Sequence, residues 1–366
     1  MRRNDHDVTD RVRTTDAAAV SAEVLHLFHG LYPRAAGGPI RRAFDHVLRL
    51  YRGRHPAFHA CDTQFHDTQH MLEVTLAMAR LMDGYERSRA GSARLSPTRY
   101  SVGVIGALFH DVGYLRRRSD RRHSHGAEYT LTHVGRSAQF LRQYLRGAGL
   151  ARYAPAGAAM VHYTGHERPA EEIRIDGVLP RRIGQMLGTA DLIAQMADRC
   201  YLEKRRDRLY AELVAGGIAG RLFRSAGELV RRTHAFHVGA ARRLDLQLAR
   251  AYEYAERHFG GQNLYLEAMQ KNGRHALLLV SAGQDGHLRR APPVDAIAHY
   301  NKWQIPFAFI VSMLVAVGQF LRYRDTDLKK LLRDLSLSLI AAALVTAAGV
   351  WFFRYDWREG TLVALL

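Results

Sequence analysis

Three short segments of the chain contain histidine and aspartate residues at spacings that suit the binding of a divalent metal ion. His66 and His70 are four residues apart, so on one helix both imidazoles would face the same side. His110 and Asp111 are adjacent at the end of an apolar stretch, and Asp191 stands in another apolar segment. Such side chains are costly to bury unless they are paired or bound to metal. Imidazole and carboxylate together suit a divalent cation, and an aspartate can bridge two cations.

Each segment has an ordinary structural explanation when it is taken alone. A histidine pair at this spacing is common on helix surfaces, a His-Asp dipeptide arises by chance, and an aspartate after alanine is usually a helix cap. The order of the three segments within one helical region favours a shared metal centre instead. Further histidines and glutamates lie between the second and third segments, each either a ligand or an ordinary polar residue: His123, His125, Glu128, His133, His162, His166 and Glu167.

Apolar residues recur at helical spacing from Val24 to about Leu279, which predicts an all-α domain. Stretches that alternate between apolar and polar residues, as strands do, are nearly absent. Ser96 and Pro97 form a cap followed by a proline, a pattern typical of the start of a helix that would run to Phe109. This helix would present the His-Asp pair at its C-terminal end.

The chain of 366 residues has a net charge of +18 and a pI near 10.3, which indicates anionic partners. We do not expect nucleic acid among them, because no known reading module is recognisable. The basic run 116–122 follows the His-Asp pair and is either a rim that attracts polyanionic substrate, a contact with acidic lipid, or a solvated loop. The two cysteines, Cys61 and Cys200, exclude a disulfide framework and a zinc ribbon.

Two runs near the C-terminus, residues 303–321 and 335–353, contain no charged residue. As helices, each would be about 29 Å long, close to the thickness of the hydrocarbon core of a bilayer. We therefore expect a transmembrane hairpin over residues 300–356, with a buried hairpin of a soluble protein as the alternative. Basic residues flank the runs equally on both sides, so the positive-inside rule does not set an orientation.

Several of these segments, in this order, resemble the HD superfamily of metal-dependent phosphohydrolases, and within it the class I cyclic-nucleotide phosphodiesterases. The resemblance covers roughly residues 45–255 and implies an HD-type helical bundle. The segments that carry it are Phe65-His66-Asp67-Thr68-Gln69-His70, His110-Asp111, Met160-Val161-His162-Tyr163-Thr164, Ala190-Asp191-Leu192, and Tyr201 with Asp207-Arg208-Leu209-Tyr210-Ala211-Glu212-Leu213.

The resemblance implies a role for each matching residue. His70, His110, Asp111 and Asp191 would bind a first metal ion, and Asp111 would bridge to a second. His66 would act as the general acid that protonates the leaving oxygen, with His66 and Asp111 as catalytic residues. The ions, zinc, manganese, magnesium or iron, would lower the pKa of a bridging water that attacks phosphorus. Two further residues, His133 and His125, would contact the second metal or the phosphate, or else be ordinary solvent-facing histidines.

The sequence departs from the family pattern in ways that bear on the substrate. Asp67 replaces the usual asparagine, and Val112–Leu115 replaces a continuation that holds a further aspartate and histidine. No purine-reading glutamine can be assigned, so the substrate-binding residues stay unassigned. No Gly-Tyr-Pro element follows Glu167, which argues against hydrolysis of cyclic di-GMP by the HD-GYP branch.

The sequence thus predicts a mobile arm over residues 1–22, a phosphohydrolase domain over 23–290 and the membrane hairpin. The predicted activity is hydrolysis of a phosphodiester in a nucleotide, a class that includes cyclic nucleotides. The alternatives are a nucleotide or alarmone phosphatase or pyrophosphohydrolase, and a non-catalytic membrane-bound sensor of nucleotide or metal. Because nucleotides and reduced thiols are cytoplasmic, we expect the large domain to face the cytoplasm. The lipid bilayer that holds the hairpin would itself be a partner of the chain.

Overall fold

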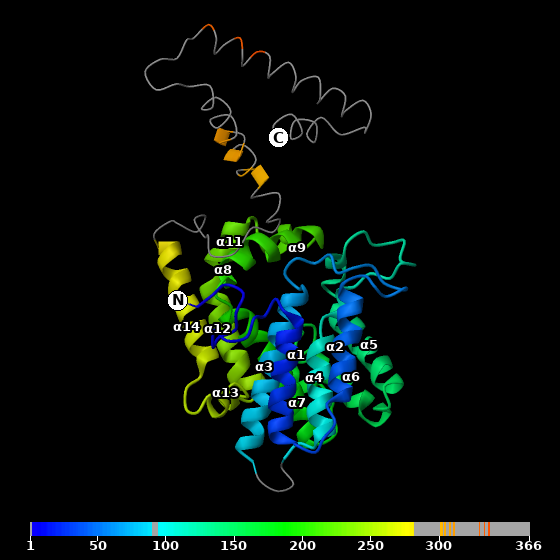
Figure 1. The fold of residues 1–366 in the computed structure, drawn as a ribbon. Coiled ribbons are helices and arrows are strands. Elements are labelled where there is room, and N and C mark those ends of the chain that lie inside the picture. The colour runs from blue at the N-terminus through cyan, green and yellow to red at the C-terminus, as the bar shows by residue number, and fades with distance from the viewer. Residues whose placement is uncertain are drawn as a thin grey trace. The chain divides into compact units, whose positions relative to one another are not determined.

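The computed structural model describes residues 2–89 and 94–281, together with ten scattered positions between 301 and 336. The chain divides into two compact units, residues Met1–Ala291 and Pro292–Leu366. All of the candidate ligands predicted from the sequence belong to the first unit (Figure 1).

The first unit is built from helices, and no strand occurs among the described residues apart from two isolated bridges. The expected all-α class is therefore confirmed for this part of the chain. The α-helices are α1 (Ala17–Leu31), α2 (Gly38–Tyr51), α3 (Thr68–Arg87), α4 (Pro97–Phe109), α5 (His133–Gly147), α6 (Ala154–Val161), α7 (Val178–Ala197), α8 (Tyr201–Lys204), α9 (Tyr210–Ala215), α10 (Ala219–Leu222), α11 (Ala226–Arg231), α12 (Thr233–Arg242), α13 (Glu253–His258) and α14 (Leu264–Ser281). Short 3₁₀ turns are η2 (Val112–Tyr114), η3 (Gly126–Tyr129), η4 (Ala151–Tyr153) and η5 (Ala170–Glu172), and η6 (Arg205–Leu209) and η7 (Arg243–Gln247) are π-helical.

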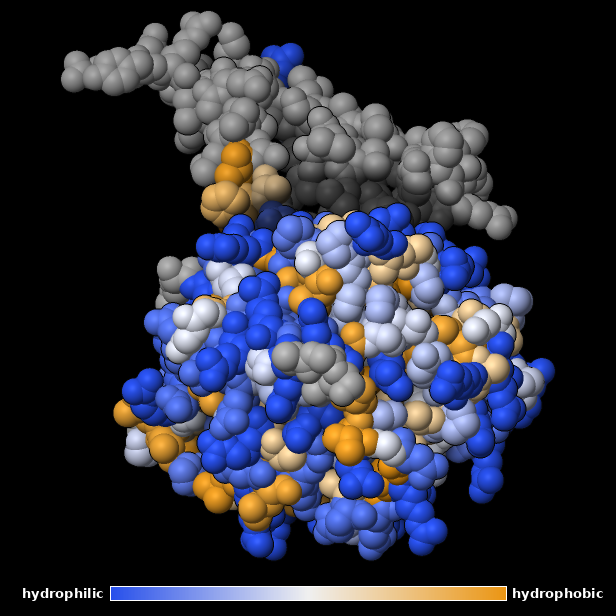
Figure 2. All heavy atoms as spheres, turned by 90° about the horizontal axis from the view of Figure 1, so that it is seen from below, coloured by the Kyte–Doolittle hydropathy of each residue, from blue (hydrophilic) through white to orange (hydrophobic). Residues whose placement is uncertain are grey.

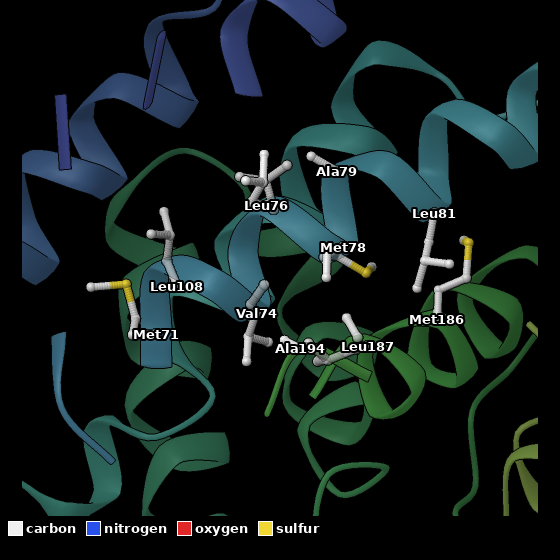
Figure 3. Close-up of a cluster of buried hydrophobic side chains, with 14 of the residues drawn as sticks. Met71, Val74, Leu76, Met78, Ala79, Leu81, Leu108, Met186, Leu187 and Ala194 are labelled. Carbon is white, nitrogen blue, oxygen red and sulfur yellow. The ribbon is translucent and has the colours of Figure 1, made fainter. Parts of the chain in front are cut away.

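Helices α3, α4 and α7 lie together at the centre of this unit, with α12 to α14 on one side and α5 and α6 on the other (Figure 1). Met78 and Leu81 of α3 lie beside Leu187 and Met186 of α7 in the core (Figure 3). All four side chains are fully buried or nearly so. Because burial of such apolar side chains stabilises the folded state by about 1.5–3 kcal/mol each, this contact sets the position of α3 against α7.

Local sequence determines where the two helices that approach the candidate ligands begin. The side chain of Asp67 caps α3 by accepting a hydrogen bond from the backbone N–H of His70, at 2.9 Å. Ser96 caps α4 in the same way, accepting from the N–H of Arg99 at 3.2 Å, with Pro97 at the first helical position. These side chains satisfy N–H groups that a helix start leaves unpaired. The predicted cap of α4 is therefore observed, and Asp67 serves as the cap of α3.

The N-terminal residues, which we expected to form a mobile arm, pack against the helical body. Asp7 is 7% exposed, and its carboxylate accepts from the guanidinium of Arg80 on α3 at 2.5 Å. Thr14 is buried and donates to Glu73 of the same helix. The difference arises because polar residues in this segment pair with buried or half-buried charged groups of α3, and composition alone does not reveal such partners.

The predicted membrane location needs correction. Within the described ranges, no helix combines the length and the apolar character needed to cross a bilayer. The three helices of at least 18 residues each contain three or more charged residues: α3, α7 and α14. The runs 303–321 and 335–353 fall mostly outside the described residues. Hydrophilic side chains dominate the face of the molecule shown in Figure 2, and apolar ones are scattered among them.

Candidate metal centre

The predicted ligands come together from the start of α3, the end of α4 and the middle of α7. His66 precedes the cap of α3, and His70 lies in the first turn of that helix. His110 is the C-cap of α4 and Asp111 follows it, so both lie where the chain leaves the helix. Asp191 lies within α7, which packs along α3. The α3–α7 and α3–α4 contacts therefore bring ligands together that are far apart in the sequence.

The ligand atoms lie at distances that suit a shared metal ion. The Nε2 atom of His70 is 3.5 Å from Oδ2 of Asp111 and 3.3 Å from Oδ1 of Asp191. The Nε2 atom of His110 is 3.1 Å from Oδ2 of Asp111 and 3.9 Å from Oδ1 of Asp191. One ligand atom each from His70, His110 and Asp191 lies within 4.8 Å of the others. Ligands about 2.0–2.2 Å from one ion are separated by such distances.

Two buried atoms of this centre lack hydrogen-bond partners among the described residues. The Nδ1 atom of His110 donates to the carbonyl of Ala107 at 2.7 Å, which leaves a lone pair on Nε2. That Nε2 and Oδ2 of Asp111 are both buried, and although they are close, they are not aligned as a hydrogen bond. Because an unpaired buried polar atom is costly, a cation bound between them would supply the missing partner. These residues therefore fit a metal ion.

The electrostatics of the centre also favour a bound cation. Burial raises the pKa of Asp111, but His110 and the other histidines outweigh it and hold that pKa well below its usual range. Burial lowers the pKa of His70, but its contacts with Asp111 and Asp191 outweigh it and raise the value to about 10. The two carboxylates thus stabilise the protonated form of His70 at the position where they would otherwise bind a cation. Metal binding would displace that proton.

Asp111 presents its two oxygens to different histidines. While Oδ2 faces His70 and His110, Oδ1 lies 3.7 Å from Nε2 of His133. The Nδ1 atom of His133 donates to the carbonyl of Thr130 at 2.7 Å, so its Nε2 lone pair faces the carboxylate. A carboxylate with one oxygen on each side is the arrangement that bridges two cations.

Glu212 of α9 is a functional candidate to which the sequence analysis assigned no role. One of its oxygens, Oε1, forms a short hydrogen bond with Nδ1 of His66. The other, Oε2, accepts from the backbone N–H groups of Phe65 at 3.1 Å and His66 at 3.4 Å. Glu212 is 3% exposed, and its charge outweighs the effect of burial and raises the pKa of His66. The segment around Glu212 was part of the resemblance, but spacing alone did not show its partner.

The remaining candidates have local partners of their own. The imidazole of His125 caps η3 by accepting from the N–H of Ala127 at 3.0 Å, and Glu128 accepts from the N–H of His125. His125 therefore has a structural role in this short helix. The other middle histidines pair as follows: His123 with Asp120, His162 with Glu167, and His166 with Arg243.

The basic run 116–122 contacts the loop between α2 and α3. Its first arginines contact residues 53–62: Arg116 pairs with Asp62, Arg117 lies over the ring of Phe58, and Arg118 donates to the carbonyl of Gly53. These contacts hold the start of the run, but five of its seven residues are exposed, so most of it is a solvated loop.

Comparisons with known proteins give weak likenesses. No protein-family model and no curated protein matches the sequence. One similar structure is the phosphodiesterase domain of the RhoPDE fusion protein from the choanoflagellate Salpingoeca rosetta, with 14% identity, a TM-score of 0.48 and coverage of 76% of this chain and 95% of that chain. A second structure, the phosphodiesterase domain of the Salpingoeca rosetta rhodopsin phosphodiesterase, has 12% identity, a TM-score of 0.46 and coverage of 77% and 93%. Membership of the HD superfamily stays a prediction.

Proposed function

We propose that this protein is a metal-dependent hydrolase of phosphoric esters that acts on the phosphodiester of a nucleotide. The observation that carries the proposal is the shared site of His70, His110, Asp111 and Asp191, with the His66–Glu212 pair beside it. Buried mixed imidazole and carboxylate groups with unpaired atoms are the ligands that such hydrolases use for divalent cations.

The residues divide between two proposed cation sites. His70, His110 and Asp191, with Oδ2 of Asp111, would hold the first ion. The other oxygen of Asp111 and Nε2 of His133 would contribute to the second. Zinc, manganese, magnesium or iron suits this ligand set. When bound, such ions supply a nucleophilic water at neutral pH and offset the negative charge of the phosphate.

The chain's own groups then act on the leaving oxygen. Oε1 of Glu212 accepts a hydrogen bond from Nδ1–H of His66, which restrains the orientation of the ring and leaves Nε2 as the atom that carries the transferable proton. The carboxylate also raises the pKa of His66, which favours the protonated imidazole that a general acid requires. We assign to Nε2 of His66 the protonation of the leaving oxygen, a role that typically contributes about 10²–10⁴-fold to the rate.

The test combines metal analysis of the purified protein with a hydrolysis panel. The panel contains cyclic nucleotides, dinucleotides, nucleoside triphosphates and an aryl phosphodiester. We expect bound divalent metal, hydrolysis of a phosphodiester, and loss of both metal and activity in Asp111→Asn. Asp176→Asn, a change at an exposed aspartate, is the matched control and should behave as wild type.

Three outcomes would contradict the proposal in different ways. If Asp111→Asn kept full metal content and activity, the assigned centre would be wrong. Hydrolysis of monoesters or pyrophosphates alone would make the protein a phosphatase or pyrophosphohydrolase. Binding of nucleotide with metal present, and no product over hours, would identify a sensor.

A further inference from the structure

Tyr114, the last residue of η2, stacks on two of the histidines described above. Its ring centroid is 4.6 Å from that of His66, with an angle of 19° between the planes. The corresponding values for His133 are 4.2 Å and 18°. Tyr114 is 2% exposed, and burial beside the carboxylates of Glu212 and Asp111 raises its pKa well above the usual value. The ring is therefore neutral and buried beside both the proposed acid and the second proposed cation site, since the centroids of His66 and His133 are themselves 6.1 Å apart.

The backbone that carries Tyr114 is held tightly against α5. Nε of Arg136 donates to the carbonyl of Gly113 at 2.7 Å, and its Nη2 donates to the carbonyl of Leu115 at 3.0 Å. The N–H of Gly113 donates to Oγ of Ser137 at 2.8 Å. Because these bonds fix the residues on both sides of Tyr114, its ring has little freedom to move relative to α5.

His66 lies before the cap of α3, outside the regular hydrogen bonds of the helix. Its backbone is held by other bonds: its N–H donates to Oε2 of Glu212 at 3.4 Å, and its carbonyl accepts from the hydroxyl of Thr63 at 2.9 Å. These bonds do not set the plane of the imidazole. The single hydrogen bond to Glu212 restrains Nδ1 but tolerates a range of ring torsions, since the terminal torsion of histidine is broad. A ring stacked on the imidazole face restricts this rotation, because aromatic pairs prefer a defined separation and tilt.

We propose that Tyr114 is a positioning residue, whose ring fixes the plane of the His66 imidazole and so directs Nε2 toward the leaving oxygen. This inference rests on the proposed function and adds to it the group that complements Glu212. Glu212 holds one edge of the imidazole and Tyr114 holds its face. The aromatic ring, rather than the phenol hydroxyl, is the part of Tyr114 that acts.

Misorientation of the acid should slow only those reactions whose leaving group needs a proton. A general loss of stability should slow all reactions alike. A nucleoside alkoxide needs a proton to leave, whereas 4-nitrophenolate leaves without one. In Tyr114→Leu we expect kcat for the nucleotide phosphodiester to fall about 10–100-fold, with KM nearly unchanged. With bis(4-nitrophenyl) phosphate, kcat should fall less than about threefold. Tyr114→Phe keeps the ring and should stay within about threefold of wild type on both substrates.

The control is Tyr85→Leu, which removes a buried ring of α3 that meets Tyr254 edge to face. Tyr85 lies fifteen residues beyond His70, about 22 Å along the helix. Its replacement should therefore not change the ratio of the two activities. If Tyr114→Leu does not fold, as judged by circular dichroism, Arg136→Lys tests the same point. It keeps the ring but loses the planar fork that binds two carbonyls, and should lower the same ratio.

The outcomes separate this inference from the proposed function. A wild-type protein without metal-dependent hydrolysis of either substrate would refute the proposed function. An active wild type combined with equal losses on both substrates in Tyr114→Leu would refute the positioning role alone. Equal losses on the nucleotide in Tyr114→Phe and Tyr114→Leu would also refute it, because they would assign the effect to the hydroxyl.

Discussion

The imidazole of His66 and the carboxylate of Glu212 are 146 positions apart in the chain and form a buried hydrogen bond beside the candidate metal centre. The contact joins the segment before α3 to α9, and no pattern in the sequence indicates that these two elements meet. Its effect is to raise the pKa of His66 and to lower that of Glu212, since burial opposes both shifts and is outweighed by the pairing.

Replacement of Glu212 by glutamine should therefore change the pH dependence of the proposed reaction. His66 must be protonated to act as an acid, and Glu212 raises its pKa, so the basic limb of the kcat profile should move to lower pH in Glu212→Gln. We expect kcat near neutral pH to fall about 10–100-fold. The measurement is a pH–kcat profile of both proteins. Glu253→Gln, at an exposed glutamate, is the control, and an unshifted basic limb in Glu212→Gln would argue against His66 as the acid.

His133 should affect the number of bound metal ions and His125 should not. The Nε2 atom of His133 faces Oδ1 of Asp111, whereas the Nδ1 of His125 caps η3. In His133→Ala we expect the metal content to fall from about two ions per chain to about one, as measured by elemental analysis after dialysis. In His125→Ala both ions should remain. Two ions in His133→Ala would show that this histidine is not a ligand.

The buried pair between Asp7 and Arg80 should contribute measurably to stability. Removal of one partner leaves an uncompensated buried charge, so Asp7→Asn should lower the free energy of unfolding by about 3 kcal/mol or more. Asp10→Asn, which breaks an exposed pair with Arg3, should change the free energy of unfolding much less, because solvent screens that pair. Urea denaturation measures both, and equal effects would contradict the packing of the N-terminal segment.

The same pair gives a pH dependence with a definite sign. Burial raises the pKa of Asp7, but Arg80 and the neighbouring donors outweigh it, so the folded-state pKa lies below the unfolded value of about 4. The stabilisation is therefore present above pH 4 and is lost as the pH falls through the lower folded-state pKa. Denaturation midpoints at a series of acidic pH values should converge for wild type and Asp7→Asn.

Gly113 should not tolerate a side chain, because a Cβ atom there would lie 1.9 Å from the carbonyl oxygen of His133. Gly113→Ala would push η2 away from α5 and should lower both activity and thermal stability. The matched control is Gly135→Ala on α5, where a Cβ would meet nothing within 4 Å. Alanine favours the helix by about 1 kcal/mol relative to glycine, so this control should be neutral or stabilising. A wild-type phenotype for Gly113→Ala would mean that the turn can shift freely.

The helical class and the identity of the candidate ligands could be read from the sequence, because both are local properties. The period of apolar residues predicts the buried face of a helix, as Met71, Val74 and Met78 illustrate, since all three are fully buried. The Ser96 cap and the His-Asp pair at the end of α4 follow from residues that are neighbours in the chain. The membrane location was wrongly predicted, since no helix among the described residues is both long and apolar enough to cross a bilayer.

The tertiary structure decided which of these local features meet. His70, His110 and Asp191 were candidates by type, but only the packing of α3 against α4 and α7 brings their ligand atoms within 4.8 Å. The partner of His66, the ring of Tyr114 on its face and the burial of Asp7 depend on segments that are distant in the chain. Sequence periodicity specifies which face of a helix is buried, but the neighbour that covers this face is selected by side-chain packing across the whole core.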